Sequence, residues 1–140
     1  DALLDRDGEN SVHPFVAGWR ERDVRIRNAV ATARAARLNR EARPYLRPSA
    51  GYDVYTERHV AEAFQRPSPL EREKELDRLR WTLMDELAGL NPFASSAVFA
   101  YALKLRLVER WNRMDAQVGN RTVDRWIEES AQAGAEGRQA

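Results

Sequence analysis

The chain contains no cysteine, and this absence excludes disulfide bonds, thiolate zinc sites and thiol catalysis. Its two histidines, His13 and His59, lie in separate segments, so we do not expect a histidine metal site. The seven glycines are scattered singly, and they form neither a phosphate-binding loop nor a nucleophile elbow. We therefore expect no cofactor and no metal, and we predict that the protein is not an enzyme.

Long hydrophobic runs are also missing. The uncharged stretch from Asn91 to Leu103 is shorter than the roughly 20 residues that a helix needs to cross a bilayer. The N-terminus lacks the basic, apolar and small-residue pattern of a signal peptide. We expect a soluble cytoplasmic protein with no membrane-spanning segment and no small-molecule substrate.

Charge of one sign is not in excess, because the net charge is +1 although 32% of the residues are charged. Such a chain has no global field that attracts a polyanion. Acidic and basic residues alternate between Glu71 and Glu86, which is typical of a solvated helix face stabilised by ion pairs. We therefore interpret these carboxylates as surface charges and not as catalytic acids or bases.

The length of 140 residues fits one domain with its own core. Polar and acidic residues make residues 1–11 a flexible lead-in, and the Ala/Gly/Glu/Gln composition makes residues 131–140 a flexible tail. The helical domain is thus expected over residues 12–130. No alternating strand pattern occurs, so the fold class is all-α with about five helices.

Apolar spacing and helix-start signals set the expected helices. The first runs from Phe15 to about Arg43, and the prolines at 44 and 48 place a loop over residues 44–53. The second covers Thr56 to Phe64, with Thr56 as its cap. The third begins at Pro69 after the cap Ser68, with Glu71 completing a capping box, and ends near Gly89.

Two further helices complete the pattern. Asn91 before Pro92 repeats the cap-plus-proline signal and predicts a helix from Phe93 to Met114. The pair Gly119-Asn120 is expected to close it, and a final short helix follows around Trp126.

The segment from Asn91 to Asn112 carries the most information in the chain. It is uncharged up to Leu103 and then turns basic and amphipathic. We predict that Phe93, Val98 and Tyr101 are buried in the core and that the basic half meets a partner. The four tryptophans fall on four different predicted helices, which favours a shared core, although one or two of them would suit an interface.

An arginine-rich stripe between Arg20 and Arg47 gives an alternative function. There the chain has nine arginines and three acidic residues, at a spacing able to follow phosphates. The alternative interpretation is therefore an Arg-rich helical protein that binds nucleic acid or acts as a scaffold. Because the total charge is balanced, nucleic acid is the less favoured partner, and the stripe suits an acidic protein surface equally well.

Several motifs resemble a known family. The helix start Pro92-Phe93, the run Val98-Phe99-Ala100-Tyr101, Lys104, Glu109-Arg110 and the downstream Gly119 resemble the closing region of the C/d-type stalk proteins of V-type and A-type rotary ATPases. Asn28 followed by Arg34-Ala35 is similar to a second motif of that family. The order of Pro69-Leu70-Glu71, Arg80-Trp81 and Ala100-Tyr101 resembles more closely a divergent bacterial family of uncharacterised proteins associated with V-type ATPases.

The resemblance implies a non-catalytic adaptor of the central stalk, which couples a soluble rotor shaft to the membrane rotor ring. Family members are longer, so it also implies that this domain is part of a larger, repeated helical fold. The implied partners are shaft and ring subunits, and the implied location is peripheral at the membrane through those subunits. A polar socket lined by basic side chains suits such a partner, and its candidates are Arg27, Arg34, Lys104 and Arg110.

Overall fold

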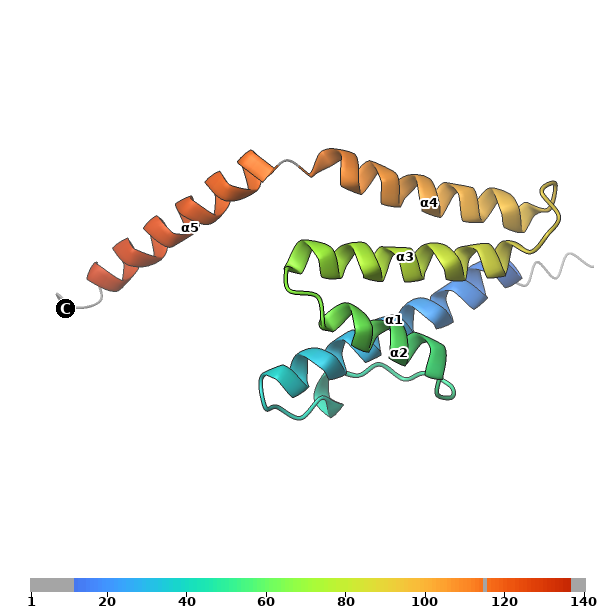
Figure 1. Cartoon of the computed structure of the whole chain (residues 1–140), viewed down its shortest axis with the longest axis horizontal. Coiled ribbons are helices and arrows are strands. Elements are labelled where there is room, and N and C mark those ends of the chain that lie inside the picture. Colours follow the sequence, from blue (N-terminus) through green and yellow to red (C-terminus); the bar gives the residue numbers. More distant parts are fainter. Residues whose placement is uncertain (1–11, 115, 137–140) are drawn as a thin grey trace, which may run out of the picture. The chain divides into compact units, whose positions relative to one another are not determined.

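The structure, a computed structural model, describes residues 12–114 and 116–136. Over these residues the fold is all-α, as the sequence predicts, with no strand. The helices are α1 (Pro14–Arg37), the short 3-10 helix η1 (Arg43–Tyr45), α2 (Val54–Phe64), α3 (Pro69–Ala88), α4 (Ser95–Arg113) and α5 (Ala116–Glu136) (Figure 1).

The chain divides into two compact units, and the division falls inside α4 between Lys104 and Leu105. The first unit contains α1, η1, α2, α3 and the first half of α4. The second contains the rest of α4 and α5. The expected lead-in, residues 1–11, and the last four residues of the expected tail lie outside the described residues. Helix α5 continues to Glu136, across the position where the sequence predicts that the tail begins.

Helix α1 ends earlier than predicted. His13 caps its start, because the imidazole accepts a hydrogen bond from the backbone N–H of Phe15, and Pro14 occupies the first turn. The helix ends at Arg37, and Asn39 then adopts a positive φ of 49°. Asparagine tolerates this left-handed conformation and ends helices as glycine does. The stop is therefore made by Asn39 and not by Pro44.

Helix α2 starts two residues before the predicted position, because its cap is Asp53 and not Thr56. The carboxylate of Asp53 accepts a hydrogen bond from the backbone N–H of Tyr55 and another from the hydroxyl of Thr56 at 2.6 Å. Thr56 is itself buried, with 1% of its surface exposed. The threonine therefore supports the cap from inside the helix.

The signals at both ends of α3 are confirmed. Ser68 Oγ accepts a hydrogen bond from the backbone N–H of Glu71, and Pro69 stands at the first helical position. At the other end Gly89 has a φ of 71°, a conformation that residues with a side chain rarely adopt. Helix α3 is thus fixed at both ends by local chemistry.

The core of the first unit lies between α1, α2 and α3, with α2 packed against both of the others (Figure 1). Gly18 of α1 permits a close approach to α3, because a Cβ at this position would lie 2.9 Å from Leu87 Cδ2. Burial of these apolar side chains is the main favourable contribution to folding. The buried cluster comprises Ile26, Ala29, Val60, Ala63, Phe64, Leu76, Leu79 and Leu83.

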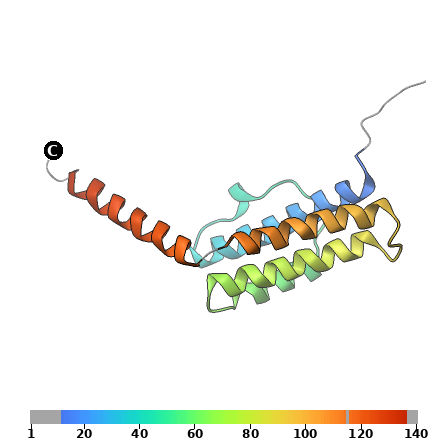
Figure 2. The same ribbon diagram turned by 90° about the horizontal axis from the view of Figure 1, so that it is seen from above.

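The first half of α4 runs antiparallel to the second half of α3 (Figure 2). Ser96 donates a hydrogen bond to the carbonyl of Ala88, and further along Lys104 forms an ion pair with Asp85. Near the start of α1, the His13 imidazole contacts the Ser95 hydroxyl at 2.8 Å, and Phe15 stacks on Phe99. Helix α4 therefore joins the first unit through both polar and aromatic contacts.

The prediction that the uncharged half of α4 is buried is wrong. Phe93, Val98 and Tyr101 are 94%, 66% and 68% exposed, and in α4 only Ala100 is buried among the residues described. The helix begins at Ser95, because Asn91 Oδ1 accepts a hydrogen bond from the N–H of Phe93 and holds residues 92–94 in a turn. The physical reason for the exposure is the orientation of α4. Ser96, Ala100 and Lys104 lie on the side that meets α3, and Val98 and Tyr101 lie on the opposite side of the helix.

The tryptophans do not share a core either. Only Trp19 packs against the buried cluster, whereas Trp81 is 40% exposed and Trp126 is 60% exposed. Trp81 lies under the ammonium group of Lys104, which is 4.6 Å from the ring centroid.

In the second unit, α5 begins at Ala116 and passes through Gly119-Asn120 without a break, so this pair does not end a helix. The helix is amphipathic. Val123, Trp126 and Ile127 lie on one side of it and are at least half exposed. No helix within the described residues is long and apolar enough to cross a membrane.

Candidate interaction surfaces

Arg27 and Arg34, two of the four residues proposed for a basic socket, lie on one face of α1. They are seven residues apart, which places them two turns from each other on the same side of the helix. The Arg27 guanidinium is engaged, since its Nε lies 2.7 Å from Asp23 Oδ2. The Arg34 side chain is exposed and lies in the last turn of α1. A positive charge there interacts favourably with the helix dipole.

The other two proposed residues have different surroundings. Lys104 pairs with Asp85 and covers the ring of Trp81, and only 16% of its side chain is exposed. Arg110 belongs to the second unit, where its guanidinium lies 5.7 Å from the centroid of Trp111. Lys104 is therefore used to attach α4 to α3. Of the proposed four, only Arg27 and Arg34 share a surface of the first unit.

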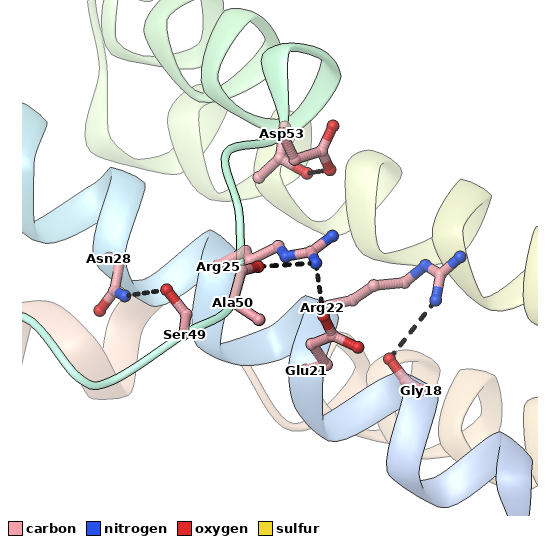
Figure 3. A network of polar contacts seen from close by, with 9 residues as sticks. Gly18, Glu21, Arg22, Arg25, Asn28, Ser49, Ala50 and Asp53 are labelled. Carbon is pink, nitrogen blue, oxygen red and sulfur yellow. Dashed lines mark hydrogen bonds and ion pairs between the residues drawn. The ribbon is translucent and has the colours of Figure 1, made fainter.

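A polar clamp holds the connector between α1 and α2 against α1 (Figure 3). The side chain of Asn28 donates to the carbonyl of Arg47 at 2.8 Å and accepts from the N–H of Arg47 at 2.9 Å, and it also contacts Ser49 Oγ. One turn earlier, Arg25 donates to the carbonyl of Ala50 and forms an ion pair with Glu21. The connector thus has defined backbone partners, although it contains little regular structure.

The pKa values of two carboxyl groups at the start of α2 are shifted in opposite directions. The hydroxyl of Thr56 is the main cause that lowers the pKa of Asp53 below its ordinary value of 3.8, and backbone hydrogen bonds and Arg25 act in the same direction. Partial burial raises the pKa of Glu57, and the neighbouring charge of Asp53 adds to this effect. The shift of Asp53 fits a helix cap, because its causes are the hydrogen bonds that the carboxylate accepts in the first turn of α2.

Arginines without an acidic partner gather at the end of α1 and in the connector. Between residues 20 and 47 the chain carries a net charge of +6, so the remaining residues carry −5. Arg34, Arg40, Arg43 and Arg47 are exposed, and within the described residues their guanidinium groups have no acidic partner. By contrast, the arginines with a carboxylate partner in the first unit are Arg25, Arg27, Arg58, Arg66, Arg78 and Arg80.

Apolar side chains lie exposed among these arginines, and the sequence reasoning missed them. Leu38, Tyr45 and Leu46 are 67%, 60% and 41% exposed. A signal for Tyr45 and Leu46 exists in the sequence, because they lie between Pro44 and Pro48 in a connector, and such residues seldom enter a core. We call these three apolar residues and the four exposed arginines together the basic end: Leu38, Tyr45, Leu46, Arg34, Arg40, Arg43 and Arg47.

A second exposed surface lies at the start of α4. Leu90 and Phe93 are almost fully exposed in the segment that precedes the helix, at 103% and 94%. Val98 and Tyr101 follow at a spacing of three on one side of α4. Isolated apolar residues on a surface are common, but large ones gathered in one region mark interaction sites. We call Leu90, Phe93, Val98 and Tyr101 the α4 apolar set.

Neither surface contains the constituents of a metal site. Among the residues that the structure describes, no group of three or more His, Cys, Asp or Glu side chains lies together. The α4 apolar set offers apolar area that a partner can bury. The basic end offers guanidinium groups that can pair with anions. Both are modes of macromolecular binding.

Part of the chain matches a known protein family. Residues 51–132, which comprise α2, α3, α4 and most of α5, match the family described as protein of unknown function DUF2764. No curated protein and no solved structure matches the chain. Since the match spans more than half of its residues, the chain belongs to the DUF2764 family.

Proposed function

We propose that this protein is a non-catalytic adaptor of the central stalk in a V-type-like rotary ATPase, where it couples the soluble rotor shaft to the membrane ring. In this role it acts by binding other subunits and lies peripherally at the membrane through them. The proposal has two supports: the resemblance of its motifs to the C/d-type stalk proteins, and the exposure of the α4 apolar set.

The exposure of the α4 apolar set carries the proposal. Phe93, Val98 and Tyr101 are among the residues on which the resemblance to rotary-ATPase stalk proteins rests, and all three are more than 60% exposed. They add little to the core of this chain, since they bury little of their surface in it. A partner that covers them gives a physical reason for large apolar side chains at these positions.

A mechanical role also suits the construction of the first unit. A coupler must transmit force without internal sliding, which favours packed helices with fixed ends. Helix α3 is capped at both ends, and the connector after α1 is fastened to α1 by Asn28 and Arg25. These features make a stiff body that offers apolar side chains to a neighbour.

The test is affinity purification of the tagged full chain from its native host at increasing salt. The proposal expects the catalytic and shaft subunits of a V-type ATPase to be retained, because apolar contacts resist salt. Retention of DNA or RNA that falls steeply with salt, without ATPase subunits, would contradict it and support the nucleic-acid alternative.

A matched pair of variants directs this test to the α4 apolar set. The variant F93A/Y101A is expected to reduce the recovery of the ATPase subunits by about tenfold or more, since exposed aromatic residues are common binding hot spots. The control Leu70→Ala removes an apolar side chain that is 53% exposed on α3 and should leave recovery unchanged. Equal recovery with both variants would exclude this surface as the docking site.

A further inference from the structure

The basic end concentrates positive charge that the first unit does not neutralise. Arg34 lies in the last turn of α1, Arg40 follows the helix, Arg43 begins η1, and Arg47 lies in the connector. These arginines fall within fourteen residues in which Glu41 is the one acidic residue. Like charges in one segment repel one another, and the repulsion falls when a carboxylate or a phosphate pairs with them. The basic end is thus a surface whose electrostatic energy falls when an anion binds.

The backbone beneath these arginines is held in place. The N–H of Arg40 donates to the carbonyl of Ala35 at 2.9 Å, the N–H of Tyr45 donates to Ala42, and Asn28 holds Arg47 through both of its backbone groups. A basic surface with a defined backbone loses less entropy on binding than a flexible tail does. The positions of the arginines are therefore set before a partner arrives.

A neighbouring arginine shows that not every guanidinium here is available. Arg37 donates to the backbone carbonyl of Phe64 and lies over the Phe64 ring, and Arg72 covers the same ring at 4.7 Å from its centroid. These two arginines attach α1 and α3 to the end of α2. Arg37 and Arg72 thus have a packing role, in contrast to the four exposed arginines of the basic end.

The apolar members of the basic end decide which class of anion fits best. A nucleic acid offers phosphates for the arginines and bases for Tyr45, but it leaves Leu38 and Leu46 in water. A protein segment covers leucines as readily as it pairs carboxylates with guanidinium groups, and arginine and tyrosine are enriched in protein interfaces.

We propose that the basic end is a docking site for an acidic protein segment that carries apolar residues among its Asp and Glu side chains. The carboxylates pair with Arg34, Arg40, Arg43 and Arg47, and the apolar residues cover Leu38, Tyr45 and Leu46. The site is distinct from the α4 apolar set in residues and in chemistry. Arginine suits this role better than lysine, because its planar fork binds a carboxylate through two hydrogen bonds.

The experiment places a photoactivatable residue in the middle of the site. The tagged full chain with Tyr45→p-benzoylphenylalanine is expressed in its native host, irradiated, purified under denaturing conditions and analysed by mass spectrometry. The proposal expects a protein adduct whose cross-linked peptide is acidic and contains apolar residues. A nuclease-sensitive adduct, an adduct on a peptide without acidic residues, or no adduct would each overturn it.

A matched pair of charge reversals tests the contribution of the arginines. In the cross-linking chain, R40E/R43E should lower the adduct yield by at least about tenfold, because like charges then face the partner. The control R58E/R78E makes the same change in charge at two exposed α2 and α3 positions and should alter the yield by less than about twofold. Equal yields with the two variants would overturn the proposal, and circular dichroism of both establishes that they remain helical.

The results also distinguish this inference from the proposed function. An acidic adduct on a protein outside a rotary ATPase supports the docking site and contradicts the rotor role. Recovery of ATPase subunits together with an adduct that is insensitive to R40E/R43E supports the rotor role and contradicts the docking site.

Discussion

Helix α3 and the first half of α4 lie side by side in the first unit, yet their apolar side chains have different environments (Figure 2). Leu76, Leu79 and Leu83 of α3 are 2% to 3% exposed, whereas Val98 and Tyr101 of α4 are 66% and 68% exposed. Both sets follow helical spacing. The difference shows that spacing identifies an apolar face, whereas the neighbouring elements determine whether that face is buried within the chain.

The two helices also begin differently, although a polar residue followed by a proline marks the start of each. Ser68 caps α3 directly, and Pro69 is its first residue. Asn91 instead closes a turn around Pro92, and α4 begins at Ser95. The turn leaves Phe93 outside the helix, where it is exposed.

The largest expected effect compares one buried and one exposed residue of these helices. Leu79→Ala should lower the free energy of unfolding by about 3 kcal/mol, because it leaves a cavity in the core. Tyr101→Ala should change it by less than about 0.5 kcal/mol, since the side chain is mostly in water. Urea denaturation followed by circular dichroism measures both. A loss with Tyr101→Ala as large as that with Leu79→Ala would show that α4 is part of the core.

A second comparison uses the two start signals. Ser68→Ala should cost about 1 kcal/mol, because the N–H of Glu71 loses its acceptor at a helix cap. Asn91→Ala removes an acceptor from a turn that precedes its helix, and we expect a cost of a few tenths, about 0.3 kcal/mol. The same denaturation experiment ranks the two. A larger cost for Asn91→Ala would mean that the turn, and not packing against α3, fixes the start of α4.

The third comparison concerns how α4 is attached to α3. Lys104→Met keeps an unbranched side chain over Trp81 and removes the charge that pairs with Asp85. Because Asp85 is more than half exposed, we expect a loss of only about 0.5 kcal/mol. A double-mutant cycle with Asp85→Asn isolates the pair. No coupling between the two substitutions would show that this ion pair does not help to hold the first half of α4.

The smallest expected effect is a change in the pKa of Asp53 at the start of α2. The lowered pKa of Asp53 means that its ionised form stabilises the fold above its unfolded value of 3.8, and that this contribution is lost as the pH falls through the folded pKa. Thr56→Val removes the hydroxyl that is the main cause and should raise the pKa of Asp53 toward its ordinary value. A carboxyl-detected NMR titration measures the midpoint. An unchanged midpoint would assign the shift to the backbone N–H groups and Arg25.

Most elements of the fold were predictable from local signals. Ser68, Pro69 and Gly89 fix the ends of α3 through capping and backbone conformation, which depend on few residues. The end of α1 was misplaced because Asn39 stops the helix before Pro44 is reached. Helix α5 was predicted too short because Gly119-Asn120, which favours a helix end, lies here in its second turn.

The candidate surfaces were predicted only in part. The arginine-rich stripe is visible in the sequence, but ion pairs with Asp23 and Glu21 and the contacts of Arg37 with Phe64 remove several members from it. Lys104, a predicted socket residue, pairs with Asp85, nineteen residues earlier in the chain, and the sequence pattern did not indicate this pair. Side-chain pairing between distant positions depends on the packing of helices, which spacing along one helix does not contain.

The sequence by itself determined the helices, their apolar faces and the excess of arginine between residues 20 and 47, because these follow from composition and from interactions within a few residues. The tertiary structure alone decided that the start of α4 meets α3 through one side, which leaves Val98 and Tyr101 exposed. It also decided which arginines have no acidic partner within the described residues. Burial and ion pairing depend on which segments meet in space, and the residues that meet come from distant parts of the sequence.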